Sequence, residues 1–171
     1  MNLFADIRAL VVAELTAMAQ EGALPQGLDL AQVTVEPPRD AAHGDMATNA
    51  AMVLAKHAGL PPRAIADALS ARLAGDPRIA GAEVAGPGFL NLRLSNVVWQ
   101  GVVQATLTEG ANFGRSTLGN NARVNIEFVS ANPTGPMHVG HVRGAVVGDA
   151  LANLLAFAGW QIGRASCRER V

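Results

Sequence analysis

The sequence contains a single cysteine, Cys167, and therefore cannot form an internal disulfide. This excludes the disulfide-stapled class of small secreted domains and is compatible with a reducing compartment. No apolar run approaches the roughly 20 residues that a membrane-spanning helix needs. The first turn of the chain contains Asp6 and no small-residue cleavage site follows, so we expect no signal peptide, no membrane association and a cytoplasmic location.

An excess of charge of one sign is also missing, because the net charge is −1 and only 16% of residues are charged. Half of the residues are hydrophobic, which excludes a disordered or collagen-like chain and supplies core for one domain and the start of another. Residues 1–110 carry seven Lys and Arg against eleven Asp and Glu, a balance of −4. Any contact of this part with a polyanion must therefore use a local patch.

Hydrophobic periodicity and turn residues predict a compact α+β module over residues 1–110. The pattern predicts helices at 3–20, 46–58, 62–73 and 96–108, and strands at 32–35, 79–84 and 89–94. A loop rich in turn formers starts at Pro37-Pro38 and carries Arg39 and His43. Phe89 and Trp99 could stack on flat ligands, but packing in the core is the favoured interpretation. The polar, glycine-rich segment 111–121 is expected to be a linker.

Residues 122–160 predict a strand, a loop and a helix in that order. The strand covers 124–128, and the Pro- and Gly-rich loop after it cannot continue a ladder. A helix is expected over 139–158, with Val147, Leu151, Leu154 and Ala158 on one stripe and Gly159 as its stop.

Two histidines, His138 and His141, stand at the predicted start of that helix, three residues apart and therefore on one side. A helix N-terminus has unpaired N–H groups and a partial positive charge, which suit anionic phosphates. Imidazoles there add donors for oxygens whose charge grows during phosphoryl or nucleotidyl transfer, worth about 2–4 kcal/mol per donor. Gly140 between them lets a flat base or ribose approach the backbone.

The motif has three other interpretations. An isolated HxxH is most often accidental or a cap of a structural turn. A zinc site lacks a third ligand, because His43 and His57 belong to the other module. A dinucleotide-binding oxidoreductase requires GxGxxG at the strand–helix turn, where this chain has PTGPMHVGH instead, so that class is rejected.

The surrounding residues resemble one known family. The stretch EFVSANPTGPMHVGHVRGAVVGDALANLL resembles the active-site region of bacterial-type arginyl-tRNA synthetases, with His138–His141 similar to their HIGH signature. Two upstream segments, PPRDAAHGDMATNAAMVLAK and EVAGPGFLNLRLS, resemble the N-terminal module of the same family. The resemblance covers the chain from Met1 to about Gly159. It implies that the strand–loop–helix begins a Rossmann-like α/β catalytic domain of a class I aminoacyl-tRNA synthetase.

The resemblance also implies an activity and the residues that carry it. The family activates L-arginine with ATP, with Mg²⁺ expected, and transfers it to tRNA(Arg), and the full-length enzyme is expected to be a monomer. His138 and His141 would be the catalytic residues. The ATP-binding residues would be Thr134, Gly135, Pro136, Met137, His138, Val139, Gly140 and His141. Those that hold arginine would be Glu127, Ser130, Ala131, Asn132 and His141.

The N-terminal module touches tRNA in this family, and Arg39 and His43 are candidate phosphate contacts. Pairing of these two residues with Asp40 and Asp45 is an equally favoured interpretation. The rival function is a stand-alone tRNA-binding module without catalysis, in which substitutions of the two histidines at 138 and 141 would be silent.

Residues 161–171 do not fit the resemblance. The sequence IGRASCRERV has three arginines, the one cysteine and no apolar periodicity, and it resembles a translated sequencing adapter. We interpret 161–171 as a non-native tail, so that Cys167 carries no functional weight. We also expect the chain to be a fragment without aminoacylation activity of its own, because one strand and one helix cannot form a doubly wound sheet.

Overall fold

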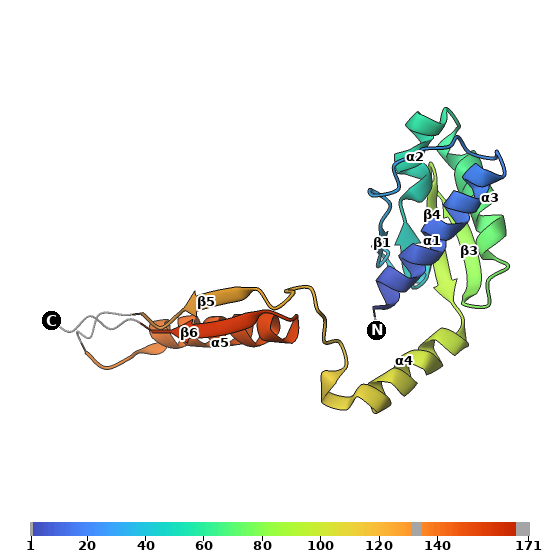
Figure 1. The fold of residues 1–171 in the computed structure, drawn as a ribbon. Coiled ribbons are helices and arrows are strands. Elements are labelled where there is room, and N and C mark those ends of the chain that lie inside the picture. The colour runs from blue at the N-terminus through green and yellow to red at the C-terminus, as the bar shows by residue number, and fades with distance from the viewer. Residues whose placement is uncertain (1, 131–134, 167–171) are drawn as a thin grey trace. The chain divides into compact units, whose positions relative to one another are not determined.

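The computed structural model describes residues 2–130 and 135–166. The chain forms two compact units, Met1–Gly110 and Ala111–Val171, drawn in Figure 1. In the described part of the chain, no helix is both long and apolar enough to cross a lipid bilayer. The α+β N-terminal module and the start of a Rossmann-like region, both predicted from the sequence, are confirmed.

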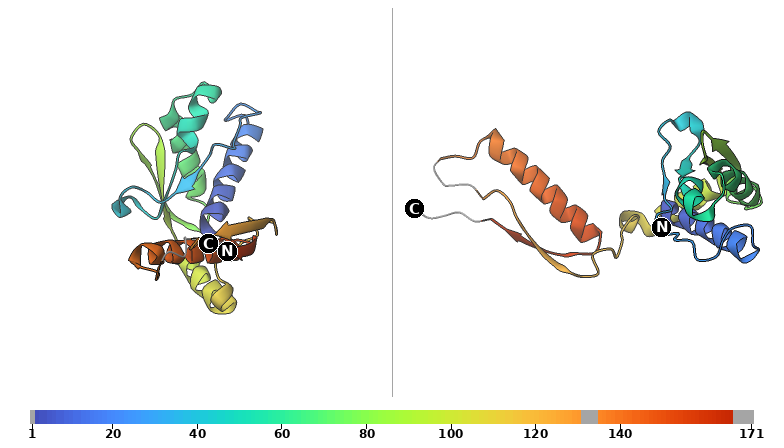
Figure 2. Two further views of the ribbon diagram at one scale, coloured as in Figure 1. Left: turned by 90° about the vertical axis from the view of Figure 1, so that its left-hand side faces the viewer. Right: turned by 90° about the horizontal axis from the view of Figure 1, so that it is seen from above.

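The first unit is an antiparallel sheet covered on one face by helices (Figure 2, left). The strand order is β1-β2-β4-β3. The strands are β1 (Val35–Glu36), β2 (Met46–Thr48), β3 (Ile79–Ala85) and β4 (Phe89–Leu94). The covering helices are α1 (Leu3–Gln20), α2 (Ala50–Ala58) and α3 (Pro62–Leu73), and a short 3₁₀ turn, η1 (Ala41–His43), lies between β1 and β2. After β4 follow α4 (Asn96–Glu109) and the 3₁₀ turn η2 (Gly110–Asn112).

The core of this unit lies between the helices and one face of the sheet. Leu90, Leu92 and Leu94 of β4 are buried in it, as the alternation of that segment predicts. The helical spacing in 3–20 is also confirmed, because α1 buries its stripe. That stripe consists of Ile7, Leu10, Val11, Leu15 and Met18. The alternate residues of β4 therefore belong to the opposite, open face of the sheet.

The helix predicted over 46–58 is wrong at its start. Met46–Thr48 forms β2, whose Met46 pairs with Leu92 of β4, and the helix begins only at Ala50. The Thr48 hydroxyl donates to the backbone oxygen of Thr34 at 2.7 Å, which ties β2 to the segment entering β1. Backbone pairing with two neighbouring strands outweighs the helix propensity of an alanine-rich segment. The first strand is likewise shorter and later than predicted, starting at Val35.

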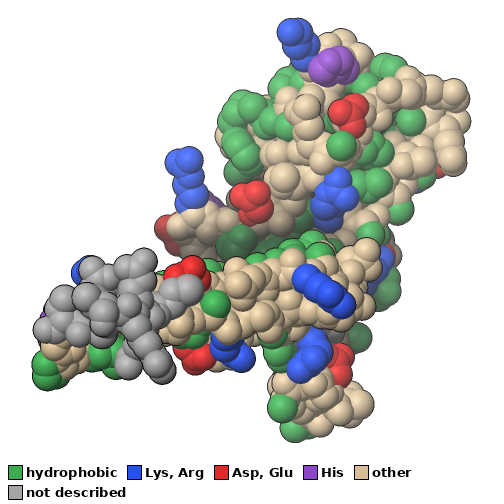
Figure 3. All heavy atoms as spheres, turned by 60° about the vertical axis from the view of Figure 1, so that its left-hand side comes forward, with side chains coloured by type: hydrophobic (Ala, Val, Ile, Leu, Met, Phe, Trp, Pro, Cys, Tyr) green, Lys and Arg blue, Asp and Glu red, His purple; other side chains and the backbone are tan. Residues whose placement is uncertain are grey.

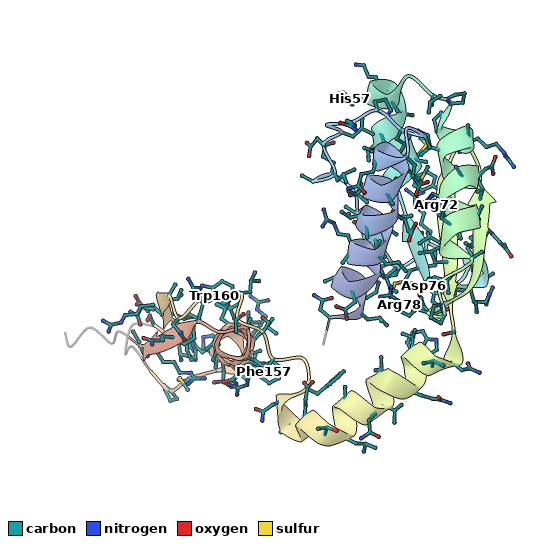
Figure 4. The ribbon with its side chains drawn as sticks, turned by 45° about the vertical axis from the view of Figure 1, so that its right-hand side comes forward. His57, Arg72, Asp76, Arg78, Phe157 and Trp160 are labelled. Atoms are coloured by element: carbon teal, nitrogen blue, oxygen red, sulfur yellow. The ribbon has the colours of Figure 1, made fainter. Side chains whose placement is uncertain are left out.

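An arginine joins helices α3 and α1 of the unit. The Arg72 side chain on α3 lies 2.7 Å from the Glu14 carboxylate and 2.8 Å from that of Glu21, both at α1 or its end (Figure 4). The hydrogen bond from Arg72 lowers the pKa of the Glu21 carboxyl below its ordinary value, and the positive charge of Arg72 acts in the same direction. Because Glu21 is exposed, water screens this pair, and it adds little to the stability of the unit.

Replacing Arg8 by alanine is expected to lower the free energy of unfolding of this unit by about 1–3 kcal/mol. The Arg8 guanidinium donates to the backbone oxygens of Val33, Leu30 and Ala31 at 2.6, 3.1 and 3.2 Å, which holds the segment leading into β1. The measurement is the urea midpoint at constant slope, with Arg63→Ala, an exposed arginine of α3, as control. Equal midpoints for the two variants would contradict this assignment.

The second unit is built on a strand–helix–strand element (Figure 2, right). β5 (Arg123–Glu127) and β6 (Gln161–Ala165) are parallel neighbours, and α5 (Val139–Phe157) connects them. We interpreted 161–171 as a tail without periodicity, yet its first five residues form β6. Parallel pairing uses backbone groups, so this strand needs no alternating side chains. Cys167 lies outside the described residues.

The segment expected to be a linker, 111–121, is attached to the second unit. The backbone N–H groups of Ser116, Gly119 and Asn121 donate to carbonyl oxygens of residues 157–159 at 3.2, 2.9 and 2.9 Å. Gly119 is buried beside Trp160, which lies at this end of α5 with Phe157 (Figure 4). A polar, glycine-rich composition indicated a connector, whereas these backbone bonds fix the segment as a cap on the end of α5.

The apolar stripe predicted on the last helix lies at the surface of this unit. Val147, Leu151 and Leu154 are 62%, 45% and 66% exposed, and such a stripe is ordinarily covered by another element. Hydrophobic side chains reach the surface over both units on the face drawn in Figure 3.

Candidate functional site

The middle of α5 packs tightly against the residue that follows β5. Gly148 on α5 lies against Phe128, and a Cβ added to Gly148 would be 2.4 Å from the Phe128 side chain. Ala152, one turn further along, is fully buried. Ligands in open α/β sheets bind at the carboxyl ends of the strands, and the loop from Phe128 to His138 leaves β5 at that edge.

The two histidines cap the helix reciprocally. The Nδ1 atom of His138 accepts the backbone N–H of Gly140 at 3.1 Å, and the Nδ1 atom of His141 accepts the backbone N–H of His138 at 3.2 Å. The two rings are stacked obliquely, with centroids 4.0 Å apart and planes at 40°. A Cβ added to Gly140 would be 2.9 Å from the His138 ring, so this residue must be small for the arrangement to form.

The capping geometry determines what each imidazole offers to a ligand. Because each Nδ1 atom accepts a backbone N–H, a neutral ring carries its own proton on Nε2. His138 is exposed and His141 is half-buried, so the pair lies at the surface. Imidazole N–H donors beside a helix N-terminus are groups that suit phosphate oxygens.

The two histidines also act as helix caps, as one of the other interpretations of the motif holds. The backbone N–H groups of His138 and Gly140 bond to the two rings and do not point to solvent. The expectation that open amides of the helix start would receive the ligand is therefore wrong for these two amides.

The other predicted site residues divide into described and undescribed ones. Glu127 is exposed at the carboxyl end of β5, where it pairs with Ala165, and Ser130 is exposed on the loop after it. Apart from the two histidines, the described residues predicted to bind ATP are all exposed, and they are Gly135, Pro136, Met137, Val139 and Gly140. The remaining predicted residues, Ala131, Asn132 and Thr134, lie outside the described residues.

Val129 has a backbone conformation that the sequence does not indicate. Its φ of 59° is in the left-handed region, which a β-branched side chain rarely adopts. The Ser166 hydroxyl donates to the Val129 carbonyl oxygen at 3.2 Å. Strained backbone of this kind collects at ligand-binding loops, and this one lies between Phe128 and Ser130.

The first unit carries a second candidate site, a groove of about 720 Å³ on the open face of the sheet. Arg39 and His43, both predicted to bind tRNA, line the same groove. It also contains Phe89 of β4, for which stacking was the less favoured interpretation, and Asn91, which the sequence did not indicate as a site residue. Its other lining residues are Thr34, Glu36, Pro37, Pro38, Ala47, Thr48, Asn49, Ala85 and Gly86.

The favoured interpretation of Phe89 and Trp99 as core residues is wrong. Phe89 is 45% exposed in the groove, and Trp99 on α4 is 41% exposed. Phe89 lies on the opposite face of β4 from Leu90, so the alternation of that strand already predicted that it leaves the core. The alternation of side chains along the strand is the sequence signal for an exposed Phe89. It outweighs the general tendency of aromatic residues to be buried.

The groove brings together groups that suit a nucleotide in an otherwise acidic unit. Phe89 offers a flat apolar surface, Asn91 an amide, and Arg39 and His43 basic groups. On the face drawn in Figure 3, basic and acidic side chains of the described residues are interspersed singly. The charged groups that line the groove are the basic Arg39 and His43 and the acidic Glu36, so any polyanion contact here is confined to the two basic residues.

Comparison with known proteins gives matches along the chain. The family model described as arginyl tRNA synthetase N terminal domain matches residues 5–94, and that for tRNA synthetases class I (R), catalytic domain, matches residues 102–167. The arginine–tRNA ligase of Cereibacter sphaeroides strain ATCC 17025 is 74% identical over 164 residues, which is 96% of this chain. That of Paracoccus denitrificans is 71% identical over the same length. The chain spans 28% of the length of these curated relatives.

Solved structures agree with these matches. Arginyl-tRNA synthetase from Thermus thermophilus superposes with a TM-score of 0.59 at 30% identity, covering 95% of this chain and 25% of that one. The Plasmodium falciparum enzyme has a TM-score of 0.70 at 16% identity, covering 97% and 30%, and supports the fold alone. With a family model over more than half of its length, the chain belongs to the arginyl-tRNA synthetase family.

Proposed function

We propose that the chain is the N-terminal part of an arginine–tRNA ligase that activates L-arginine with ATP and transfers it to tRNA(Arg) in the cytoplasm. The observation that carries the proposal is the reciprocally capped imidazole pair at the start of α5, in a chain 74% identical to an arginine–tRNA ligase. In this proposal residues 1–110 contact tRNA, 122–160 begin the catalytic domain, and the full-length enzyme works as a monomer.

The proposed chemistry needs no covalent nucleophile on the protein. A carboxylate oxygen of arginine attacks the α-phosphorus of ATP, and the bond to pyrophosphate breaks, which leaves arginyl-adenylate. A terminal hydroxyl of tRNA(Arg) then attacks the activated carbonyl carbon and releases AMP. The Nε2–H groups of His138 and His141 stabilise charge that grows on phosphate oxygens in the first step.

Arginine would bind on the strand side of the same loop. Glu127 supplies a carboxylate for a cationic group, and the proposed amide and hydroxyl groups of Asn132 and Ser130 supply hydrogen bonds. Ala131 lies between them in the sequence. In the described part of the chain no group of three or more His, Cys, Asp and Glu residues is placed to hold a metal ion. Mg²⁺ is therefore proposed only as the ion that accompanies the ATP phosphates.

Residues of the groove would contact tRNA in the first unit. Phe89 would stack on an unpaired base, Asn91 would hydrogen-bond to it, and Arg39 and His43 would meet the neighbouring phosphates. Glu36 in the same groove disfavours a phosphate beside it, so the base and the backbone of the RNA would take different sides.

The test is ATP–pyrophosphate exchange with arginine by a hybrid synthetase. This hybrid joins residues 1–160 of the chain to the remaining part of the Cereibacter sphaeroides relative. Arginine-dependent exchange is the expected result, and a folded hybrid with none would overturn the proposal. The chain alone is expected to show no exchange, because β5 and β6 form a two-stranded sheet and the stripe of α5 is exposed.

A stand-alone tRNA-binding module is the second candidate, favoured by the groove lying wholly within the first unit. It requires residues 1–110 to bind tRNA(Arg) as tightly as the hybrid does. It also requires that substitutions of His138 and His141 change nothing measurable.

A further inference from the structure

We propose that Asp45 is a positioning residue of the groove, which fixes the wall that carries Arg39 and His43 against β4. The effect of Asp45 on RNA binding rests on the proposed tRNA contact. The geometry that Asp45 imposes on the loop is a property of the free protein. Asp45 itself does not line the groove. Its effect must pass through the backbone of the loop 37–45, the segment from the end of β1 to the start of β2.

The Asp45 side chain makes a hydrogen bond to β4 at a position where β2 no longer pairs with it. The pairing of β2 with β4 ends at Met46 opposite Leu92, while β4 continues to Leu94. The Asp45 N–H donates to the Leu92 oxygen at 2.9 Å, and the Leu94 N–H donates to Oδ2 of Asp45 at 2.7 Å. The carboxylate thus accepts the N–H of Leu94, which has no backbone partner on β2. This position is half-buried, so an unpaired N–H donor there would lower the stability of the unit.

The residue before Asp45 presses the loop onto the same strand. Gly44 has a φ of 116°, and a Cβ added there would be 2.7 Å from the Leu92 oxygen. This close backbone approach leaves no room for a side chain. Gly44 and Asp45 therefore form one latch, through which the loop is attached to β4.

The turn η1, which carries His43, directly precedes Gly44 and Asp45 in the sequence. The Asp40 carboxylate accepts the Ala42 N–H at 2.9 Å, and the His43 N–H donates to the backbone oxygen of Asp40 at 3.0 Å. The Ala42 oxygen in turn accepts from the Arg93 guanidinium on β4 at 3.5 Å, a long bond that adds little. Release of Asp45 would free the turn η1 to move away from Phe89.

The charge of Asp45 argues against a direct contact with RNA. A carboxylate near a phosphate backbone is repelled by it, whereas a carboxylate that accepts a backbone N–H can organise the loop at no such cost. The positioning role explains why an acid stands two residues from a predicted phosphate contact. It also separates Asp45 from Arg39 and His43, whose removal would lower RNA affinity directly.

The test compares Asp45→Ala, Asp45→Asn and Asp29→Ala in the full chain. Asp29 is the matched control, because its carboxylate also accepts a backbone N–H, that of Ala31 at 2.8 Å, but outside the groove. The first measurement is the NMR shift of the His43 imidazole and the exchange rate of the Leu94 amide in the free protein. Asp45→Ala should move both, while Asp45→Asn, which keeps an acceptor oxygen, and Asp29→Ala should leave both near the parent values.

The second measurement is the affinity for a tRNA(Arg) transcript at fixed salt, where every variant is folded. Asp45→Ala should bind about tenfold more weakly, Asp45→Asn should recover most of that loss, and Asp29→Ala should bind as the parent does. Should Asp45→Ala fail to fold, Gly44→Ala serves instead, because its added Cβ opposes the Leu92 oxygen while the carboxylate stays.

The outcomes separate this inference from the proposed function. Unchanged His43 and Leu94 signals in Asp45→Ala would overturn the positioning role, whatever the RNA does. If the His43 and Leu94 signals change in Asp45→Ala, the positioning role is supported. If the parent chain also binds tRNA(Arg) no better than another tRNA, the proposed tRNA contact is contradicted while the positioning role stands. Altered signals with unchanged affinity for tRNA(Arg) would overturn the functional part of the inference.

Discussion

Alanine in place of His138 or His141 in the hybrid synthetase is expected to lower ATP–pyrophosphate exchange about 100- to 1,000-fold. In the proposed reaction, each substitution removes an Nε2–H donor to phosphate oxygens on which charge grows. It also removes one half of the reciprocal cap, in which each Nδ1 atom accepts a backbone N–H within 3.2 Å. The matched control is His57→Ala, an exposed histidine on α2 of the first unit, which should exchange at the parent rate (Figure 4).

A third variant distinguishes catalysis from capping. Serine is a good N-cap residue, so His138→Ser keeps an acceptor for a backbone N–H while it removes the imidazole. We expect His138→Ser to keep the thermal stability of the parent and to lose exchange as the alanine variant does. Full exchange by His138→Ser would mean that His138 acts only as a cap.

Alanine in place of Phe89 is expected to weaken binding of tRNA(Arg) by the hybrid roughly 10- to 100-fold, since stacking on one base contributes about 1–3 kcal/mol. Phe89 is 45% exposed in the groove, so its removal costs little core packing. Trp99→Ala is the control, because Trp99 is 41% exposed but lies on α4, outside the groove. Fluorescence anisotropy with labelled tRNA at one fixed salt concentration measures both.

Phe89→Tyr should retain the affinity, because its ring still offers a flat surface for a base. A loss of affinity in Trp99→Ala equal to that in Phe89→Ala would contradict the assignment of the groove. The dependence on salt should also be shallow, since Arg39 and His43 are the basic groups of the groove and few counterions are released.

Several parts of this fold follow directly from sequence periodicity. The stripe of α1 and the alternation of β4 each repeat long enough to determine both the element and its buried face. β2 could not be predicted in the same way. Met46–Thr48 is short and precedes an alanine-rich helix, and only its partners in the sheet make it a strand.

At the two sites, the contacts that the sequence does not predict are hydrogen bonds that depend on the folded structure. The placement of His138 and His141 at a helix start followed from the loop before them, but their mutual hydrogen bonds required coordinates. Asp45 accepts the N–H of Leu94, a residue 49 positions away in the sequence, so no local pattern could indicate that bond. β6 was missed because a parallel strand needs no alternation of side chains.

The most direct test of the account is a crystal structure of the hybrid synthetase with arginine and a non-hydrolysable ATP analogue. The account predicts a phosphate oxygen within about 2.7–3.2 Å of Nε2 of His138 or His141, at the start of α5. A triphosphate bound at another part of the enzyme, with both imidazoles still capping the helix and touching no phosphate, would contradict it.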